Sequence, residues 1–229
     1  MARRGVIYMV WGRDDRVERA LERSRKSVNA IHPELPVEVI RVDAGEGPKG
    51  LLEKARMLER SPFRETLFLD ADTVVLDRLD FAFHKAQEFG IACCICENPW
   101  AKRYNSAIKG ETVEYNTGVL FFTERAKPVF QSWVRLAAQL DSSIVHLSAS
   151  GQRLVMLHND QCSFAAAIEK TKFLPFVLPI NWNFRPQWHL SFFGPVKVWH
   201  DYGEVPHFLV EAAKYYRQPQ SIIQYHAAR

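Results

Sequence analysis

The sequence predicts an α/β fold, because short apolar strands alternate with helical segments along the first third of the chain. Apolar runs at 6–10, 37–42 and 66–69 have the length and composition of buried strands. The segments between these runs place apolar or small residues at the spacing of a helix face. This alternation is typical of parallel strands joined by crossover helices.

The composition sets the scale of the molecule. The chain has 229 residues, of which 47% are hydrophobic and 24% are charged, and this suits a domain with an ordinary core. We therefore expect a single domain over residues 1–229. The formal charge of +4 is too small to indicate nucleic-acid binding, although it would favour an anionic ligand.

Hydrophobic runs are short throughout the chain. None approaches the length that a membrane span needs, and residues 1–5 are followed by only a short strand-like run, Val6 to Trp11. The sequence thus predicts a cytoplasmic protein without a transmembrane segment, and a peripheral position at a membrane stays open.

The four cysteines do not have the spacing of a zinc ribbon. Cys93, Cys94 and Cys96 are crowded together, and Cys162 stands alone. The apolar run 91–95 indicates a buried strand around the first of them. We expect reduced thiols in the core.

The first helix is predicted to follow the strand at 6–10. Its apolar or small positions are Val17, Ala20, Leu21, Ser24 and Val28. Asp15, with Glu18 three residues later, resembles a capping box and predicts the start of this helix. A second helix is predicted over 51–58, between the second and third strands.

Two further strands are predicted at 91–95 and 119–122. The polar connection between them, 98–114, is long enough to suggest a lid.

A helix is predicted to begin near Pro128, because proline suits a first helical turn. Its apolar stripe is Phe130, Trp133, Val134 and Ala137. Another helix is predicted over 161–168, for which Asp160 would serve as the N-cap. A strand is predicted at 196–199.

Paired carboxylates follow the third strand. Asp70 and Asp72 come directly after the apolar run 66–69, and side chains two apart on a strand share a face. In open α/β sheets, ligands gather just beyond the carboxyl ends of the strands. Carboxylates in this place can hold a hard divalent cation against a diphosphate.

The polar motifs form a series along the chain. In order they are Lys54, Asp70-Ala71-Asp72, Asn116-Thr117-Gly118 opening the strand at 119–122, Asp160-Gln161, and His200-Asp201-Tyr202-Gly203. This series resembles the GT-A glycosyltransferases, and within them the glycogenin-like and lipopolysaccharide-galactosyltransferase-like group. The resemblance covers most of the chain and implies a Rossmann-like α/β fold with a mixed, mainly parallel central sheet flanked by helices.

The resemblance also implies a metal site. Asp70 and Asp72 would hold Mn²⁺, or Mg²⁺, with His200 as a third protein ligand and the donor's diphosphate completing the coordination. A mixed oxygen and imidazole set suits Mn²⁺ better than Ca²⁺.

The donor would be a nucleotide-diphosphate sugar, with a UDP-sugar expected. By the same resemblance Lys54 and Asn116 would contact the donor, and the backbone at Gly118 and Gly203 would approach it closely. Asp160 and Gln161 would lie near the anomeric carbon as catalytic groups. Tyr8 and Trp11, at the end of the first strand, are candidates for stacking on the nucleobase.

The implied reaction is hexosyltransferase-like transfer to an acceptor, with retention of anomeric configuration. No motif in the sequence identifies the acceptor, which could be a glycan, a lipid-linked sugar or a protein. The chain also departs from the group's pattern after Gly203, because no lysine followed by Pro-Trp is present. His207 or Lys197 could replace that lysine at the phosphate.

Three other functions compete with this interpretation. Asp70 and Asp72 also fit the first motif of haloacid-dehalogenase-like phosphatases, but the acidic pair that such a site needs downstream is absent from the sequence. Gly45, Gly47 and Gly50 fit a dinucleotide-binding loop of an oxidoreductase, which would leave the later motifs unexplained. A catalytically silent sugar-nucleotide or carbohydrate-binding module is the third alternative.

Overall fold

The computed structural model describes residues 3–43, 50–96, 112–147, 150–187, 191–215 and 222–224. Most of the expected lid at 98–114 therefore lies outside the described residues. Gly45 and Gly47 of the alternative dinucleotide-binding loop lie outside them as well.

A six-stranded sheet forms the centre of the molecule. In spatial order its strands are β2 (Val37–Val42), β1 (Arg4–Trp11), β3 (Glu65–Leu69), β6 (Tyr115–Thr123), β5 (Ile91–Ile95) and β9 (Phe176–Leu178). The pairs β1–β2, β1–β3 and β5–β9 are parallel, whereas β6 runs antiparallel to both β3 and β5. The predicted mixed, mainly parallel sheet is confirmed.

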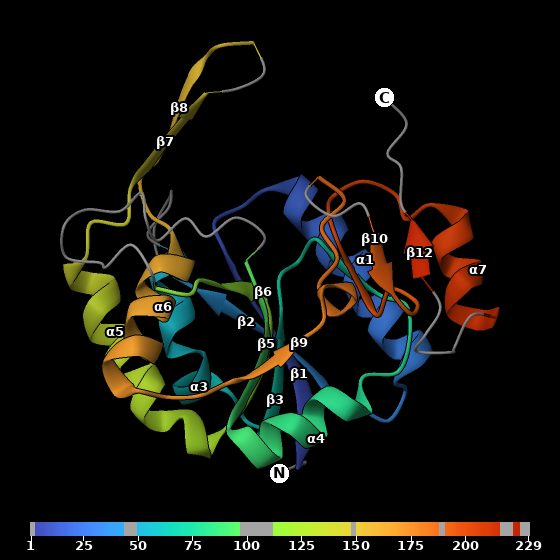
Figure 1. Cartoon of the computed structure of the whole chain (residues 1–229), viewed down its shortest axis with the longest axis horizontal. Coiled ribbons are helices and arrows are strands. Elements are labelled where there is room, and N and C mark those ends of the chain that lie inside the picture. The colour runs from blue at the N-terminus through green and yellow to red at the C-terminus, as the bar shows by residue number, and fades with distance from the viewer. Residues whose placement is uncertain are drawn as a thin grey trace.

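Helices cover both faces of this sheet (Figure 1). One layer holds α1 (Asp15–Ile31) and α4 (Asp80–Phe89), and the other holds α5 (Lys127–Gln139) and α6 (Asp160–Thr171). Strand β6 shows why two layers form. Val119 and Phe121 belong to the core under α1 and α4, whereas Leu120 and Phe122 belong to the core under α5 and α6. Alternate side chains of a strand buried on both faces supply both cores.

Shorter elements complete the chain. They are α2 (Gly50–Glu53), η1 (Lys54–Arg56), α3 (Met57–Arg60), β4 (Thr73–Val75), η3 (Glu124–Ala126), β7 (Ile144–Leu147), β8 (Arg153–Met156), η4 (Ile180–Trp182), β10 (Ser191–Phe193), β11 (Val198–His200), α7 (His207–Tyr215) and β12 (Ile222–Gln224). The hairpin of β7 and β8 projects from the body (Figure 1). Strand β4 pairs with β11, which sets His200 opposite Thr73. The late motif is thereby carried back beside the paired aspartates.

Two predicted helix starts are wrong. Asp14, not Asp15, is the N-cap of α1, because its side chain accepts a hydrogen bond from the N–H of Arg16 at 2.7 Å. Glu18 instead pairs with Arg41 on β2. Asn159, not Asp160, caps α6 through a hydrogen bond from the N–H of Gln161 at 2.9 Å. In both cases the cap lies one residue earlier, and Asp160 keeps its carboxylate for other partners.

Other predicted bounds also change. The helix expected over 51–58 is divided into α2, η1 and α3, and the strand expected at 196–199 is β11 at 198–200. Strand β6 begins at Tyr115, so Asn116-Thr117-Gly118 lies within the strand and does not open it. Pro128 does lie in the first turn of α5.

The four cysteines are buried thiols outside any disulfide, as expected. Among the described residues, no helix is both long enough and apolar enough to cross a bilayer.

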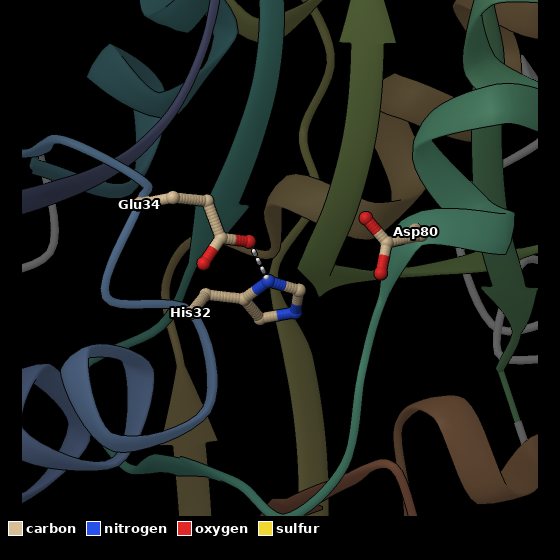
Figure 2. A group of neighbouring side chains, drawn as sticks. All are labelled: His32, Glu34 and Asp80. Atoms are coloured by element: carbon tan, nitrogen blue, oxygen red, sulfur yellow. Dashed lines mark hydrogen bonds and ion pairs between the residues drawn. The ribbon is translucent and has the colours of Figure 1, made fainter.

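His32 joins the end of α1 to the start of α4. Its Nδ1 lies 2.9 Å from Glu34 Oε1, and its Nε2 accepts a hydrogen bond from the N–H of Leu79 at 2.9 Å. Asp80 lies close by at the start of α4 (Figure 2). Arg78 contacts both carboxylates, Glu34 Oε1 at 2.9 Å and Asp80 Oδ2 at 2.8 Å. Both ring nitrogens of His32 have protein partners, and the Arg78 guanidinium balances the two carboxylates. We therefore assign this group a structural role, in which it holds the end of α1 against the start of α4.

We expect His32→Ala to lower the free energy of unfolding by about 1–3 kcal/mol, because the buried N–H of Leu79 loses its acceptor. Urea denaturation measures this change. His207→Ala, at a side chain that is 87% exposed, is the control and should change little. An unfolding free energy that His32→Ala leaves unaltered would contradict the assignment.

Candidate active site

A cavity of about 500 Å³ opens beyond the carboxyl ends of β1 and β3, and it is called the cleft below. Of the residues predicted for the site, the structure brings nine to its wall. They are Trp11, Lys54, Asp70, Asp72, Asn116, Gly118, Asp160, Gln161 and His200.

Two predicted donor contacts lie elsewhere. Tyr8 is fully buried in the core, and its hydroxyl lies 2.8 Å from Ser24 Oγ. Gly203 lies outside the cleft lining, in a turn where its N–H donates to Asp201 Oδ1 at 2.6 Å. Trp11 does line the cleft, and its ring packs over Gly50, where a Cβ would come within 2.1 Å of the indole.

Asp70, Asp72 and His200 converge at one point of the cleft. Their nearest nitrogen and oxygen atoms all lie within 4.8 Å of one another. His200 Nε2 is 3.4 Å from Asp72 Oδ1 and 3.8 Å from Asp70 Oδ2. Backbone hydrogen bonds fix this arrangement, from Asp70 N to Gly118 O at 2.8 Å and from Asp201 N to Asp72 O at 2.9 Å.

Gly118 leaves the space that this group needs. A Cβ at this position would lie 2.3 Å from His200 Cε1 and 2.6 Å from Asp70 Oδ2. Only glycine fits here, because the His200 imidazole and the Asp70 carboxylate lie against the backbone of β6. Two carboxylates and one imidazole form a donor set that fits Mn²⁺ or a similar divalent ion.

The electrostatics also favour a cation here. Burial acts to lower the pKa of His200, but the carboxylates of Asp72 and Asp70 outweigh it and raise that pKa. Burial acts to raise the pKa of Asp72, yet the charge of His200 and its hydrogen bond lower that pKa to about 2. Burial raises the pKa of Asp70, against the opposing charge of Lys54. A divalent ion would supply the positive charge that the imidazolium supplies to these carboxylates.

A chain of amides orients the imidazole. His200 Nδ1 lies 2.7 Å from Asn183 Oδ1, and Asn183 Nδ2 donates to Asn116 Oδ1 at 2.7 Å. Asn116 Oδ1 also accepts from the N–H of Gly118 at 2.9 Å. The Asn116 side-chain atom that accepts from the N–H of Gly118 must be the amide oxygen. The Asn183 atom that faces this oxygen must therefore be the nitrogen of its NH₂ group. Asn183 therefore presents oxygen to His200, holds the proton on Nδ1 and leaves Nε2 for a ligand.

Sequence reasoning assigned no role to Asn183. It lies in the polar and aromatic segment after β9, it is 1% exposed, and its partners come from β6 and β11. An asparagine flanked by Trp182 and Phe184 was the available signal in the sequence, since an amide placed among buried aromatic side chains needs hydrogen-bond partners.

Lys54 lies between two carboxylates. Its Nζ is 2.9 Å from Asp70 Oδ1 and 2.8 Å from Asp160 Oδ2, and the residue is 2% exposed. Burial acts to lower the pKa of Lys54, but Asp160 and Asp70 outweigh it and raise that pKa. Thr117 Oγ1 also donates to Asp160 Oδ2 at 2.6 Å. The ammonium thus links Asp70 to Asp160 at the start of α6.

No protein-family model matches the chain, and neither does any curated protein sequence. Solved structures do match. Mouse xyloside xylosyltransferase 1 has a TM-score of 0.56 and 15% identity, over 90% of this chain and 100% of that one.

Two other solved structures are similar over almost the whole chain. A glycosyltransferase involved in glycosylation of the major capsid of PBCV-1 has a TM-score of 0.55 and 12% identity, over 93% of this chain and 100% of that one. The galactosyltransferase LgtC, solved with donor and acceptor sugar analogues, has a TM-score of 0.52 and 14% identity, over 93% and 96%. The chain has the GT-A glycosyltransferase fold. The expectation for the fold is confirmed, and the likeness to the glycogenin-like group stays a prediction.

We expect Asn183→Ala to free the His200 ring, because Nδ1–H loses its acceptor. Mn²⁺ affinity should fall about 10- to 100-fold, the usual effect of losing such an outer partner, as measured by electron paramagnetic resonance. Nitrogen-15 NMR of the metal-free protein, at a pH where the ring is neutral, should show a mixture of His200 tautomers.

The matched control for this prediction is Asn181→Ala. Asn181 is also buried, lies on the same segment and donates to Pro195 O at 2.7 Å, outside the cleft lining. It should lower stability and keep Mn²⁺ affinity. Equal Mn²⁺ binding by wild type and Asn183→Ala would contradict the positioning role.

Proposed function

We propose that this protein is a metal-dependent glycosyltransferase, which moves a sugar from a nucleotide-diphosphate sugar, expected to be a UDP-sugar, to an acceptor with retention of configuration. The observation that carries the proposal is the convergence of Asp70, Asp72 and His200 in the cleft of a GT-A fold. The fold supports glycosyl transfer as a class. The side-chain group supports dependence on a divalent metal.

The chemistry needs a means to stabilise the departing nucleoside diphosphate. A divalent ion held by Asp70, Asp72 and His200, Mn²⁺ in preference to Mg²⁺, would supply Lewis-acid stabilisation of that charge. Asn183 and Gly118 set the imidazole in place for this purpose. Lys54 is ion-paired with Asp70 Oδ1 at 2.9 Å and holds that carboxylate at the cleft.

Asp160 and Gln161 also line the cleft, at the start of α6. The Asp160 carboxylate is held by Lys54 and Thr117, and Gln161 Nε2 donates to Glu114 Oε1 at 3.4 Å. Fixed polar groups in a sheltered site can stabilise the cation-like sugar that forms as the glycosidic bond to phosphate breaks. We assign this role to Asp160 and Gln161, and contact with the donor to Asn116 and Trp11.

The three competing functions have less support or predict a different result. A phosphatase of that type would need a downstream acidic pair, which the sequence lacks, and the fold is shared with glycosyltransferases. Gly50 of the glycine series packs against Trp11, which gives that glycine a packing role. A catalytically silent binding module would bind the donor without hydrolysing it.

A panel of nucleotide sugars, scored for hydrolysis with Mn²⁺, with Mg²⁺ and with chelator, tests the proposal without knowledge of the acceptor. One donor should be hydrolysed only with metal. Asp72→Ala should lower this rate by about a hundredfold or more and abolish the thermal stabilisation that UDP with Mn²⁺ gives.

The control for that variant is Glu22→Ala, on the exposed face of α1, which should behave as wild type. Stabilisation by UDP and Mn²⁺ that persists in Asp72→Ala would overturn the site assignment. Metal-independent hydrolysis would overturn the proposed dependence.

A further inference from the structure

The proposed donor brings at least two negative charges into a cleft whose described lining already includes three aspartates. Among the described residues that line the cleft, the cationic side chains besides His200 are Lys54 and Arg185. Lys54 is already engaged by Asp70 and Asp160 at 2.9 and 2.8 Å and is 2% exposed. Its charge balances carboxylates of the protein.

Neither of the residues that the sequence suggested for the phosphate lines the cleft. Lys197 Nζ lies 2.5 Å from Asp77 Oδ2 and also lies over the ring of Trp182. The His207 side chain is 87% exposed and faces Glu211 on its own helix.

The backbone fixes the position of Arg185 beside the metal group. The preceding residue, Phe184, is fully buried, and its N–H donates to Val198 O at 2.8 Å. The N–H of His200 donates to Phe184 O at 2.9 Å. Arg185 therefore leaves a short strand-like bridge next to His200 and enters the cleft wall. Its positive charge acts on the imidazole, where it opposes the rise in the pKa of His200.

We propose that Arg185 binds the diphosphate of the nucleotide-sugar donor beside the metal group. This inference rests on the proposed function and assigns a binding residue for its donor. A guanidinium suits the role, because its planar fork can donate two hydrogen bonds to phosphate oxygens and stays charged at any working pH. In the implied reaction, the same contact would stabilise the nucleoside diphosphate as it departs.

Titration calorimetry with UDP and with uridine, both in the presence of Mn²⁺, tests this assignment. Arg185→Gln should bind UDP about 10- to 100-fold more weakly than wild type, the loss expected for a hydrogen bond between charged groups. Uridine affinity should not change, since uridine carries no phosphate. Arg185→Lys should recover part of the UDP affinity, and His207→Gln is the control that should match wild type.

Mn²⁺ binding without nucleotide separates this role from a purely structural one. Removing a positive charge near the ion should leave Mn²⁺ affinity equal or higher in Arg185→Gln. If Arg185 instead held the aspartates in place, Mn²⁺ and UDP affinity would fall together, and the proposal would be overturned.

The remaining outcomes are also decisive. Wild-type and Arg185→Gln proteins that bind UDP equally would overturn the role of Arg185 and leave the proposed function standing. Failure of wild type to bind UDP, GDP, CDP or ADP with Mn²⁺ would overturn the proposed function and this inference with it. Thermal melting of Arg185→Gln without ligand confirms that the variant is folded.

Discussion

The antiparallel pairing of β4 with β11 is the constraint on which the site depends. Strand β4 follows directly after Asp70 and Asp72, and β11 ends at His200. Their register sets His200 opposite Thr73, and a hydrogen bond from Asp201 N to Asp72 O continues the pairing. Without this short ladder, the carboxylates at the sheet edge would have no imidazole beside them.

Charge balance is the second condition for the site. Three carboxylates lie at the cleft, and Coulomb repulsion between them would be strong in a partly desolvated space. Lys54 is buried between Asp70 and Asp160, while His200 faces Asp70 and Asp72. Lys54 thus balances Asp70 and Asp160, and His200 balances Asp70 and Asp72, the pair that could accept a divalent ion. Lys54 therefore contributes to the site by what it neutralises within the protein.

The segment from η4 to Arg185 connects the fold to this chemistry. Asn183 orients His200, and Arg185 follows at the cleft wall. Between them, Phe184 donates to Val198 O and accepts from the N–H of His200, both on β11. A stretch that looks like an ordinary polar and aromatic loop in the sequence thus carries two functional assignments. The roles of its residues depend on contacts with β6 and β11, which are distant in the chain.

The sequence by itself determined the strands β1, β2, β3 and β5, the amphipathic helices and the convergence of acids at a sheet edge. These features follow from local hydrophobic periodicity, which burial in two layers imposes directly on neighbouring residues. Only the tertiary structure decided that Asn159 caps α6 and frees Asp160, that Tyr8 is a core residue, and that Asn183 and Arg185 belong to the site. The physical reason is that a polar side chain's role depends on which partner lies within hydrogen-bond distance, and those partners come from strands far apart in sequence.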